Sequence, residues 1–531
     1  MKIYKIVAFL VAFALLSGCA PQQQPSQSHT QQTKYPVPED AVKIALSDEG
    51  ITVDGTAVSG DPTNAVYTAN DIIYYESGKD FTYGEGGVSD AHTAEEAAAH
   101  TVVHITKPGT YALSGKLSKG QIAVDLGSDA KKDKSAVVTL VLNGLDISCD
   151  VAPAVIFYNV YECGDDENPA KDVDTSAAGA NVILADGSEN TVNGSYVAKI
   201  YKPDSVELNE AGTEVEDAKK LHKYDAAFYS KMTMNVTGNT GVLNINAANE
   251  GLDSELHLTL NGGNVNIRSG NDGINTNEDG VSVTTINGGK LTVLVTGETG
   301  EGDGIDSNGW LVINGGTVIA SACARSADAG IDSDMGIHIN GGTVIAGGSM
   351  LDRIEDGGQT HVVFSFRQRQ AGNLSLTLKD EKGNTVAELA PGNDYSTLVY
   401  CSPDLKEGVY TLWNGEQQLA VSSGGGMGGR PGMGGFPGGA ERPERPEGME
   451  RPADIPENTL PEGATPPEGG QLPDGWEFKN WFGGQQPPEK PEGEGRPEGG
   501  FRPGGNNTSI GESSNQFTIV PGANYFTVTT G

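Results

Sequence analysis

A repeat of 26 to 27 residues constrains this chain more than any other feature. Four Asn-Gly-Gly elements begin at Asn261, Asn287, Asn314 and Asn340, and each follows Leu or Ile. Their spacings are 287−261 = 26, 314−287 = 27 and 340−314 = 26 residues. A β-rich period of this length, with glycine at the turns and no helical periodicity, is typical of a solenoid. We therefore expect β coils that stack about 4.8 Å apart.

A second, acidic element precedes each Asn-Gly-Gly turn. It reads Gly, then Ile or Leu, then Asp or Asn, then Ser or Thr, and stacking turns its acidic positions into two columns. The predicted metal-ligating residues are Glu250, Asp272, Asp303 and Asp328 for the first column, and Asp253, Asn275, Asp306 and Asp332 for the second. Asp328 is included because the register position beside it is an alanine.

Stacked carboxylates repel one another. Two unit charges about 4.8 Å apart repel by roughly 1 kcal/mol in water and by roughly 3–4 kcal/mol at an effective dielectric of about 20. Between Glu250 and Asp334 the chain has 13 acids against three cations. Ca²⁺ suits such a site because it accepts several carboxylate and carbonyl oxygens in loose geometry. We expect calcium at the columns; the alternative is that these side chains cap turns and stay solvated.

The N-terminus predicts export. Residues 1–18 have a basic start and a short apolar run, as in a secretion signal. Leu16-Ser17-Gly18-Cys19 resembles a bacterial lipobox, which implies a lipid anchor on Cys19 and an extracytoplasmic, membrane-held protein at the cell surface. The alternative is an ordinary signal peptide with a chance cysteine. Residues 19–40, rich in Gln, Ser and Pro, are predicted to be a flexible tether.

Composition divides the rest of the chain. Residues 41–350 are predicted to form the solenoid, and residues 361–531 a small antiparallel β module. Within that module, residues 424–509 are rich in Gly, Pro and Glu and are predicted to be a disordered insertion. The alternating segment 516–531 is expected to return as two short strands that close the module.

Charge and cysteine content narrow the function. The formal net charge of −36 excludes nucleic-acid binding, because the chain repels phosphate. No Cys-x-x-Cys pair is present, which argues against a thiolate metal site. Cys149 and Cys163 are close enough in sequence to form a disulfide in an oxidising compartment; four separate buried thiols is the other interpretation.

Four further segments accompany the acidic turns and their Asn-Gly-Gly partners: residues 109–125, 138–147, 181–192 and 402–412. Together these segments resemble the bacterial carbohydrate-binding-domain proteins, which have a right-handed parallel β-helix like that of pectate lyases. The resemblance spans about residues 40–422. It implies calcium in the helix, binding of acidic plant polysaccharides such as polygalacturonate and also of cellulose, and no established catalysis. Asn275 and the alanine at position 329 depart from an all-acid pattern, which leaves the number of metal sites open.

Calcium fits both the acidic columns and the family resemblance, because the cation is able to bridge an acidic protein and an acidic glycan. Trp310 and Tyr229 are the predicted aromatic platforms for sugar rings, although either would also suit a core. Arg268 and Arg325 complete the predicted carbohydrate-binding residues. The sequence thus favours a surface-anchored, calcium-binding, non-catalytic polysaccharide-binding protein, and it does not indicate an oligomeric state.

Other classes of function stay open. A calcium-dependent polysaccharide lyase needs a base beside the metal, and Arg268, Arg325, Lys199, Lys202 and Lys223 are candidates, but none falls in a catalytic motif. A glycoside hydrolase needs two carboxylates at a defined separation. The chain has many acids, which leaves this function open, but their number does not show that two of them form such a pair. A structural adhesin that uses the solenoid only as a spacer is the third alternative.

Overall fold

The computed structural model describes residues 33–165, 168–424 and 514–529. All of these residues lie in one compact unit formed by residues 1–432 and 510–531. The predicted signal peptide, Cys19 and nearly all of the insertion 424–509 lie outside the described residues. The described chain is almost entirely β-structure, with one short helix, α1 (Ala94–Ala98), and two 3-10 turns, η1 (Ser128–Lys132) and η2 (Pro203–Ser205). No helix in these ranges is long and apolar enough to cross a membrane.

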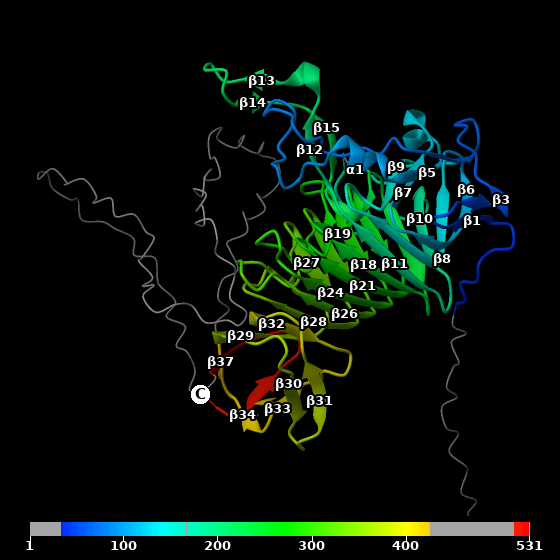
Figure 1. Cartoon of the computed structure of the whole chain (residues 1–531). Coiled ribbons are helices and arrows are strands. Elements are labelled where there is room, and N and C mark those ends of the chain that lie inside the picture. Colours follow the sequence, from blue (N-terminus) through cyan, green and yellow to red (C-terminus); the bar gives the residue numbers. More distant parts are fainter. Residues whose placement is uncertain (1–32, 166–167, 425–513, 530–531) are drawn as a thin grey trace, which may run out of the picture. The chain divides into compact units, whose positions relative to one another are not determined.

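Stacked coils form three parallel ladders of strands (Figure 1). The first ladder contains β8 (Val138–Cys149), β10 (Ala180–Leu184), β17 (Met234–Gly238), β20 (His257–Leu260), β23 (Val283–Ile286), β25 (Trp310–Ile313) and β27 (Gly336–Ile339). The second continues from the far half of β8 through β11 (Glu189–Gly194), β18 (Val242–Ala247), β21 (Asn264–Ser269), β24 (Lys290–Val295), β26 (Thr317–Ser321) and β28 (Thr343–Gly348). The third contains β5 (Thr101–Ile105), β7 (Gly120–Asp125), β9 (Val155–Asn159), β16 (Ala226–Ser230), β19 (Glu250–Ser254) and β22 (Ile274–Thr276).

Strand register confirms the period read from the sequence. Leu260 pairs with Ile286, Ile286 with Ile313, and Ile313 with Ile339, so each coil advances by 26 or 27 residues. Equivalent residues of successive coils therefore lie on top of one another, as the Asn-Gly-Gly spacing predicts.

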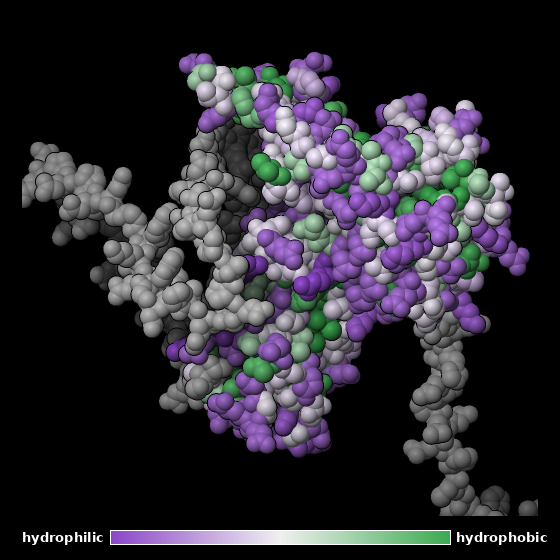
Figure 2. All heavy atoms as spheres, in the orientation of Figure 1, coloured by the Kyte–Doolittle hydropathy of each residue, from purple (hydrophilic) through white to green (hydrophobic). Residues whose placement is uncertain are grey.

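Alternation along each strand separates the core from the outer surface. In β21, Val265 and Ile267 are buried, whereas Asn266 and Arg268 between and after them are exposed. The apolar side chains of successive coils join one continuous core. Outward positions of β11, β18 and β21 are mostly Asn and Thr, so hydrophilic residues cover these strands in Figure 2.

The N-terminal end of the ladders is closed by additional strands. β1 (Val42–Leu46) pairs in parallel with β6 (Gly109–Leu117), which in turn pairs with β8. Short antiparallel strands β2 (Thr52–Val53) and β3 (Thr56–Ala57) cover β1, and β4 (Val66–Ala69) covers β5. The segment before β1 also packs on the coils, because the Tyr35 N–H donates to Asp186 and Val37 contacts a small apolar cluster. The predicted tether 19–40 is therefore wrong over residues 35–40, which are part of the folded unit.

An excursion from the coils forms a two-part arm (Figure 1, top). β12 (Val197–Tyr201) pairs antiparallel with β15 (Lys220–Tyr224), and β13 (Glu207–Leu208) with β14 (Val215–Asp217). The arm enters the third ladder directly, because β15 is followed by β16. It therefore places lysine side chains beside that ladder.

The C-terminal module is joined to the last coil by antiparallel pairing. β32 (Tyr395–Cys401) pairs with β28 and with β29 (His361–Gln370), and β37 (Ala523–Thr529) pairs with β29 and with β35 (Ala420–Ser423). A second sheet contains β30 (Leu376–Asp380), β31 (Thr385–Leu389), β33 (Gly408–Asn414), β34 (Gln417–Gln418) and β36 (Phe517–Ile519). The expected return of the chain end as two strands is confirmed, although the β29–β37 pair is parallel in a module predicted to be antiparallel.

Candidate functional site: the acid columns

The two predicted columns are present, and backbone hydrogen bonds define their register. In the first, the N–H groups of Gly251, Gly273 and Gly304 each donate to a carbonyl of the next coil, those of Asp272, Asp303 and Ala329. Glu250, Asp272, Asp303 and Ala329 are therefore equivalent positions. In the second, Asp253 pairs with Asn275, and the Asp306 and Asp332 N–H groups donate to Ile274 and Ile305.

Most acids of the first column accept main-chain hydrogen bonds from a neighbouring coil. Asp272 Oδ1 accepts the Asp303 N–H, and Asp303 Oδ1 accepts the Ala329 N–H, both at 2.6 Å. Asp328 lies beside the column and accepts the Gly302 N–H at 2.6 Å. These three carboxylates thus cap turns, which is the alternative role considered for the acidic elements, and each is bonded through one of its two oxygens.

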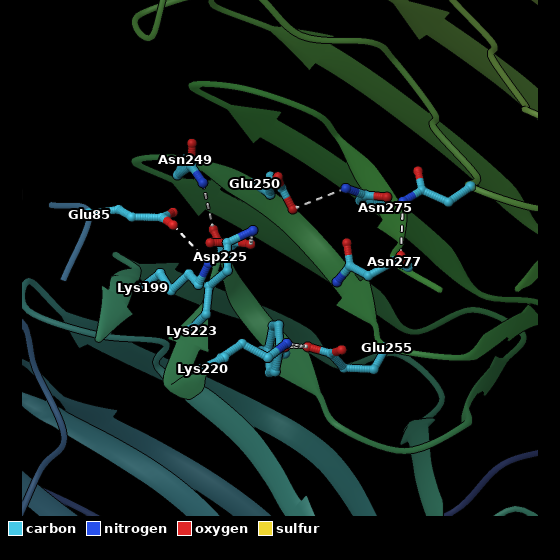
Figure 3. Close-up of polar contacts among 12 residues, drawn as sticks. Glu85, Lys199, Lys220, Lys223, Asp225, Asn249, Glu250, Glu255, Asn275 and Asn277 are labelled. Carbon is cyan, nitrogen blue, oxygen red and sulfur yellow. Dashed lines mark hydrogen bonds and ion pairs between the residues drawn. The ribbon is translucent and has the colours of Figure 1, made fainter. Parts of the chain in front are cut away.

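The first two positions of the second column, Asp253 and Asn275, differ because their side-chain oxygens lack hydrogen-bond donors among the described residues. We call these two residues and the adjacent Glu250 the column head. Asp253 is 0% exposed, and neither of its carboxylate oxygens has a hydrogen-bond partner within the described ranges. The same holds for Oδ1 of Asn275, which is also buried. The Asn275 amide instead points its Nδ2 at Glu250 Oε2, 3.5 Å away (Figure 3). Buried oxygens without hydrogen-bond donors normally cost free energy. The side-chain oxygens of Asp253 and Asn275 are therefore the atoms of the columns that most require a bound ligand.

Burial dominates the electrostatics of the columns. It raises the pKa of Glu250 well above its usual range, and the charge of Asp253 adds to the effect. Burial likewise raises the pKa of Asp253, Asp272 and Asp303 far above that of an ordinary aspartate. Such shifts mean that the folded protein disfavours the ionised carboxylates unless a proton or a cation neutralises them.

The later coils carry milder versions of the same shift. Burial, followed by the charge of Asp334, raises the pKa of Asp306 to about 6. Burial, followed by the charge of Asp352, raises the pKa of Asp332 to about 7. Both side chains are partly exposed, unlike Asp253.

Lysines of the arm neutralise the acids next to the column head (Figure 3). Lys223 Nζ lies 2.6 Å from Asp225 Oδ2, and Lys220 Nζ lies 3.5 Å from Glu255 Oε1. Burial lowers the pKa of Lys223, but the acids around it, Asp225 first and then Glu250 and Asp253, together raise it, and the net shift is upward. Sequence reasoning named Lys223 only as a candidate base and did not name Asp225 or Lys220. Their adjacency to the coil that begins at β16 was the available signal.

The oxygen-rich column head fits a hard cation in chemistry but is not a closed cage. Carboxylate and amide oxygens are ligands that Ca²⁺ prefers. Over the described part of the chain, however, no three Asp, Glu, His or Cys side chains are grouped so as to hold a metal ion by themselves. Residues Asp253, Asn275 and Glu250 would hold such an ion only with further oxygen ligands from the backbone, from water or from a bound molecule.

Tyr229 is corrected from a sugar platform to a buried residue. It is 1% exposed, pairs with Asp253 in register and donates its hydroxyl to the carboxylate of Glu255. Its ring also contacts Tyr224 of the arm. Tyr229 thus begins the second column, and neither face of its ring is free for a ligand.

The other predicted sugar contacts lie outside the column strands β19 and β22. Trp310 begins β25 in the first ladder and is partly exposed, so its role stays a prediction. Arg268 is exposed on β21 in the second ladder, on a different sheet from β19 and β22. Arg325 is exposed and donates to the carbonyl of Gly297 at 2.6 Å. The sequence grouped these residues with the acids, but Trp310 and Arg268 lie in other ladders, and Arg325 alone belongs to the turn that continues to Asp328.

The four cysteines Cys149, Cys163, Cys323 and Cys401 are free thiols. Burial raises the pKa of Cys149 to about 12, which makes it unreactive. Of the two interpretations of Cys149 and Cys163, the structure therefore has the one without a disulfide.

Residues 99–361, which contain all three ladders and both columns, match the family model described as a carbohydrate-binding domain-containing protein. This segment is 361−99+1 = 263 residues of 531. Over it, the chain is similar to the carbohydrate-binding-domain family, and the resemblance noted in the sequence is confirmed.

Two known proteins are similar to parts of the chain. A carbohydrate-binding domain-containing protein of Acetivibrio thermocellus is 32% identical over 167 residues, which is 31% of this chain and 44% of that protein. The chain thus matches less than half of that relative's length. The solved structure of a polysaccharide lyase-like protein from C. thermocellum, a gadolinium derivative, is 21% identical, with a TM-score of 0.34 over 57% of this chain and 90% of that one.

Proposed function

We propose that this protein is a non-catalytic polysaccharide-binding protein that uses calcium at the acid columns to bind an acidic glycan at the bacterial surface. The match of residues 99–361 to the carbohydrate-binding-domain family model supports polysaccharide binding. The observation that carries the calcium part is the buried carboxylate of Asp253, whose two oxygens have no donor among the described residues.

Calcium and glycan are proposed to bind together. Because the side chains do not form a complete cage, oxygen atoms from a uronate are suited to complete the coordination shell. The partly exposed Asp306 and Asp332 continue the same column and offer an accessible edge for such a contact. Calcium affinity is then expected to rise in the presence of polygalacturonate, and glycan affinity to rise with calcium by the same factor.

The architecture that presents these columns is proposed to be a right-handed parallel β-helix. Connections between parallel strands of one sheet are right-handed in nearly all proteins. The lipid anchor on Cys19 is proposed from its lipobox-like context and would hold the binding unit at the outer surface of the membrane.

A calcium-dependent lyase is the competing function, and the state of Lys223 argues against it. A base must be unprotonated to remove a proton, whereas the ion pair with Asp225 raises the pKa of Lys223. Arg268 and Arg325, two of the other four candidates, do not lie in the strands of the column sheet.

The test is incubation of the purified protein with polygalacturonate in millimolar calcium and in EDTA. Calcium-dependent co-sedimentation without ultraviolet absorbance from unsaturated uronide is expected. Appearance of that absorbance, abolished in Lys223→Ala, establishes the lyase instead. Absence of binding in both buffers leaves only the spacer function and refutes the proposal.

A further inference from the structure

Asp225 extends the first acid column by one coil toward the N-terminus. Ala226 pairs in register with Glu250, so the column position of that coil is an alanine, and Asp225 directly precedes it. The other end of the column has the same arrangement, because Asp328 directly precedes Ala329. The carbonyl of Asp225 accepts the Glu250 N–H at 3.1 Å, which fixes its main chain beside the column head.

The ion pair of Asp225 with Lys223 joins a buried carboxylate to a half-exposed ammonium (Figure 3). Lys223 Nζ lies 2.6 Å from Asp225 Oδ2, and the Asp225 side chain is 11% exposed, whereas the Lys223 side chain is 44% exposed. A lysine ammonium is a point charge on a flexible four-carbon stem. The Lys223 side chain can therefore turn toward solvent, while the Asp225 carboxylate stays in place.

The Lys223 ammonium also interacts with the column head. After Asp225, the negative charges of Glu250 and Asp253 raise the pKa of Lys223. The Asp253 carboxylate is 0% exposed and has no hydrogen-bond donor within the described ranges, which indicates a ligand that the polypeptide does not supply. A divalent cation bound there would be repelled by the Lys223 ammonium and would compete with it for carboxylate oxygens.

The arm supplies the positive charge that the coils lack at this site. The three cations between Glu250 and Asp334 lie outside the column strands β19 and β22. Lys220 of the arm pairs with Glu255, and that carboxylate also accepts the Tyr229 hydroxyl. Lys223 is therefore the arm ammonium whose partner belongs to the first column.

We propose that Lys223 couples the two ligands of the column head: its ammonium leaves Asp225 when a divalent cation binds, and then binds a carboxylate of the glycan. This inference rests on the proposed function and deepens it, because it assigns Asp225 as a further cation ligand and Lys223 as the residue that selects acidic sugars. Calcium and glycan then bind cooperatively, since the ammonium that becomes free in the first step is the group used in the second.

The test is isothermal titration of the full chain with calcium, in the absence and in the presence of hexagalacturonate, with a blank titration of the glycan alone. Lys223→Met removes the charge and keeps an unbranched side chain, whereas Lys223→Arg keeps the charge. Lys116→Met is the matched control, because it removes an ammonium that lies 2.7 Å from Asp146 on strands of another sheet.

Opposite changes in the two measurements are expected for Lys223→Met. Calcium alone should bind about tenfold more tightly, because the competing ammonium is gone. The factor by which hexagalacturonate raises the calcium affinity should fall about tenfold, because the glycan contact is gone. Lys223→Arg should retain that factor, and Lys116→Met should change neither quantity by more than about twofold.

The outcomes separate this inference from the proposed function. A wild type that binds both ligands, with a Lys223→Met variant that is unchanged or weaker in both measurements, makes the ion pair purely structural and leaves the proposed function standing. A wild type that binds neither calcium nor hexagalacturonate refutes the proposed function, and the inference with it. Should Lys223→Met fail to fold, Asp225→Asn decides: about tenfold weaker calcium binding supports the exchange, and wild-type affinity overturns it.

Discussion

At the scale of single residues, acids of the two columns have different chemical roles. Asp272 and Asp303 each bond a backbone N–H of the next coil, whereas Asp253 bonds none among the described residues. The least stabilised carboxylate of the second column is therefore that of Asp253, at its buried end. The arm adds Lys223 nearby, but that ammonium is paired with Asp225.

Asp253→Asn is predicted to stabilise the calcium-free protein. It replaces a buried carboxyl group whose oxygens have no hydrogen-bond donor, and removing that desolvation penalty is expected to stabilise the protein by about 1 kcal/mol or more. The Tm increase that calcium produces in the wild type is predicted to shrink or vanish. Calorimetry in EDTA and in calcium measures both; Glu381→Gln, on an exposed turn, is the control. A less stable variant with an intact calcium response would contradict the prediction.

Acidification is predicted to stabilise the calcium-free protein. The pKa values of Asp306, about 6, and Asp332, about 7, lie above the unfolded value of about 3.9. The folded state therefore binds these protons more tightly, and stability rises as pH falls from about 8 toward 5. With calcium bound the trend reverses, because protons compete with the cation. Urea unfolding at several pH values checks both slopes; a calcium-free protein that weakens over this window refutes the expectation.

At the scale of elements, coil stacking depends on backbone close approach as much as on apolar burial. Gly289, Gly316 and Gly342, the second glycines of three Asn-Gly-Gly turns, have positive φ, and a Cβ on each would lie 2.4–2.8 Å from a carbonyl oxygen of the preceding coil. This requirement explains why the sequence repeats Asn-Gly-Gly rather than a general polar turn.

Gly289→Ala is predicted to destabilise the coils by more than the conformational cost alone. A left-handed backbone costs an alanine about 1–2 kcal/mol, and the Cβ would also meet Gly263 O at 2.4 Å. Gly300→Ala is the matched control, since Gly300 has φ +100° and no atom within 4 Å of the added Cβ. Thermal unfolding followed by circular dichroism should show a clearly larger loss for Gly289→Ala. Equal losses would mean that stacking is not the constraint.

At the scale of the whole described unit, the last coil is closed by a module that the chain end completes. Phe364 contacts both Phe517 and Phe526, which come from the returning strands β36 and β37. This aromatic cluster belongs to a core separate from that of the coils. The closure covers the final strand β28 with β32, which protects an edge that would otherwise pair with other chains.

Phe364→Ala is predicted to cost about 3–5 kcal/mol in the module. Hydrogen exchange should quicken in β29 to β37 and remain slow in the coils, with calcium binding unchanged. Phe81→Ala, at a side chain 48% exposed, serves as the control. Loss of protection in β19 and β22 would show that the two cores unfold as one.

Three features could be predicted from the amino-acid sequence: the stacked coils, their 26-to-27-residue register and the two acidic columns. It could do so because these features repeat, and each copy reports the same short-range turn chemistry at Asn261, Asn287, Asn314 and Asn340. The return of residues 516–531 as strands was also readable from their alternation.

The folded chain was needed to distinguish the acids that accept main-chain hydrogen bonds from Asp253, which accepts none among the described residues, and the buried aromatic rings from the exposed ones. Tyr229 is buried because the arm, which does not repeat, packs Tyr224 against it. Tyr35 joins the surface of the coils through Asp186, 151 residues away. Such contacts depend on chain segments that meet only after folding, so no local pattern encodes them.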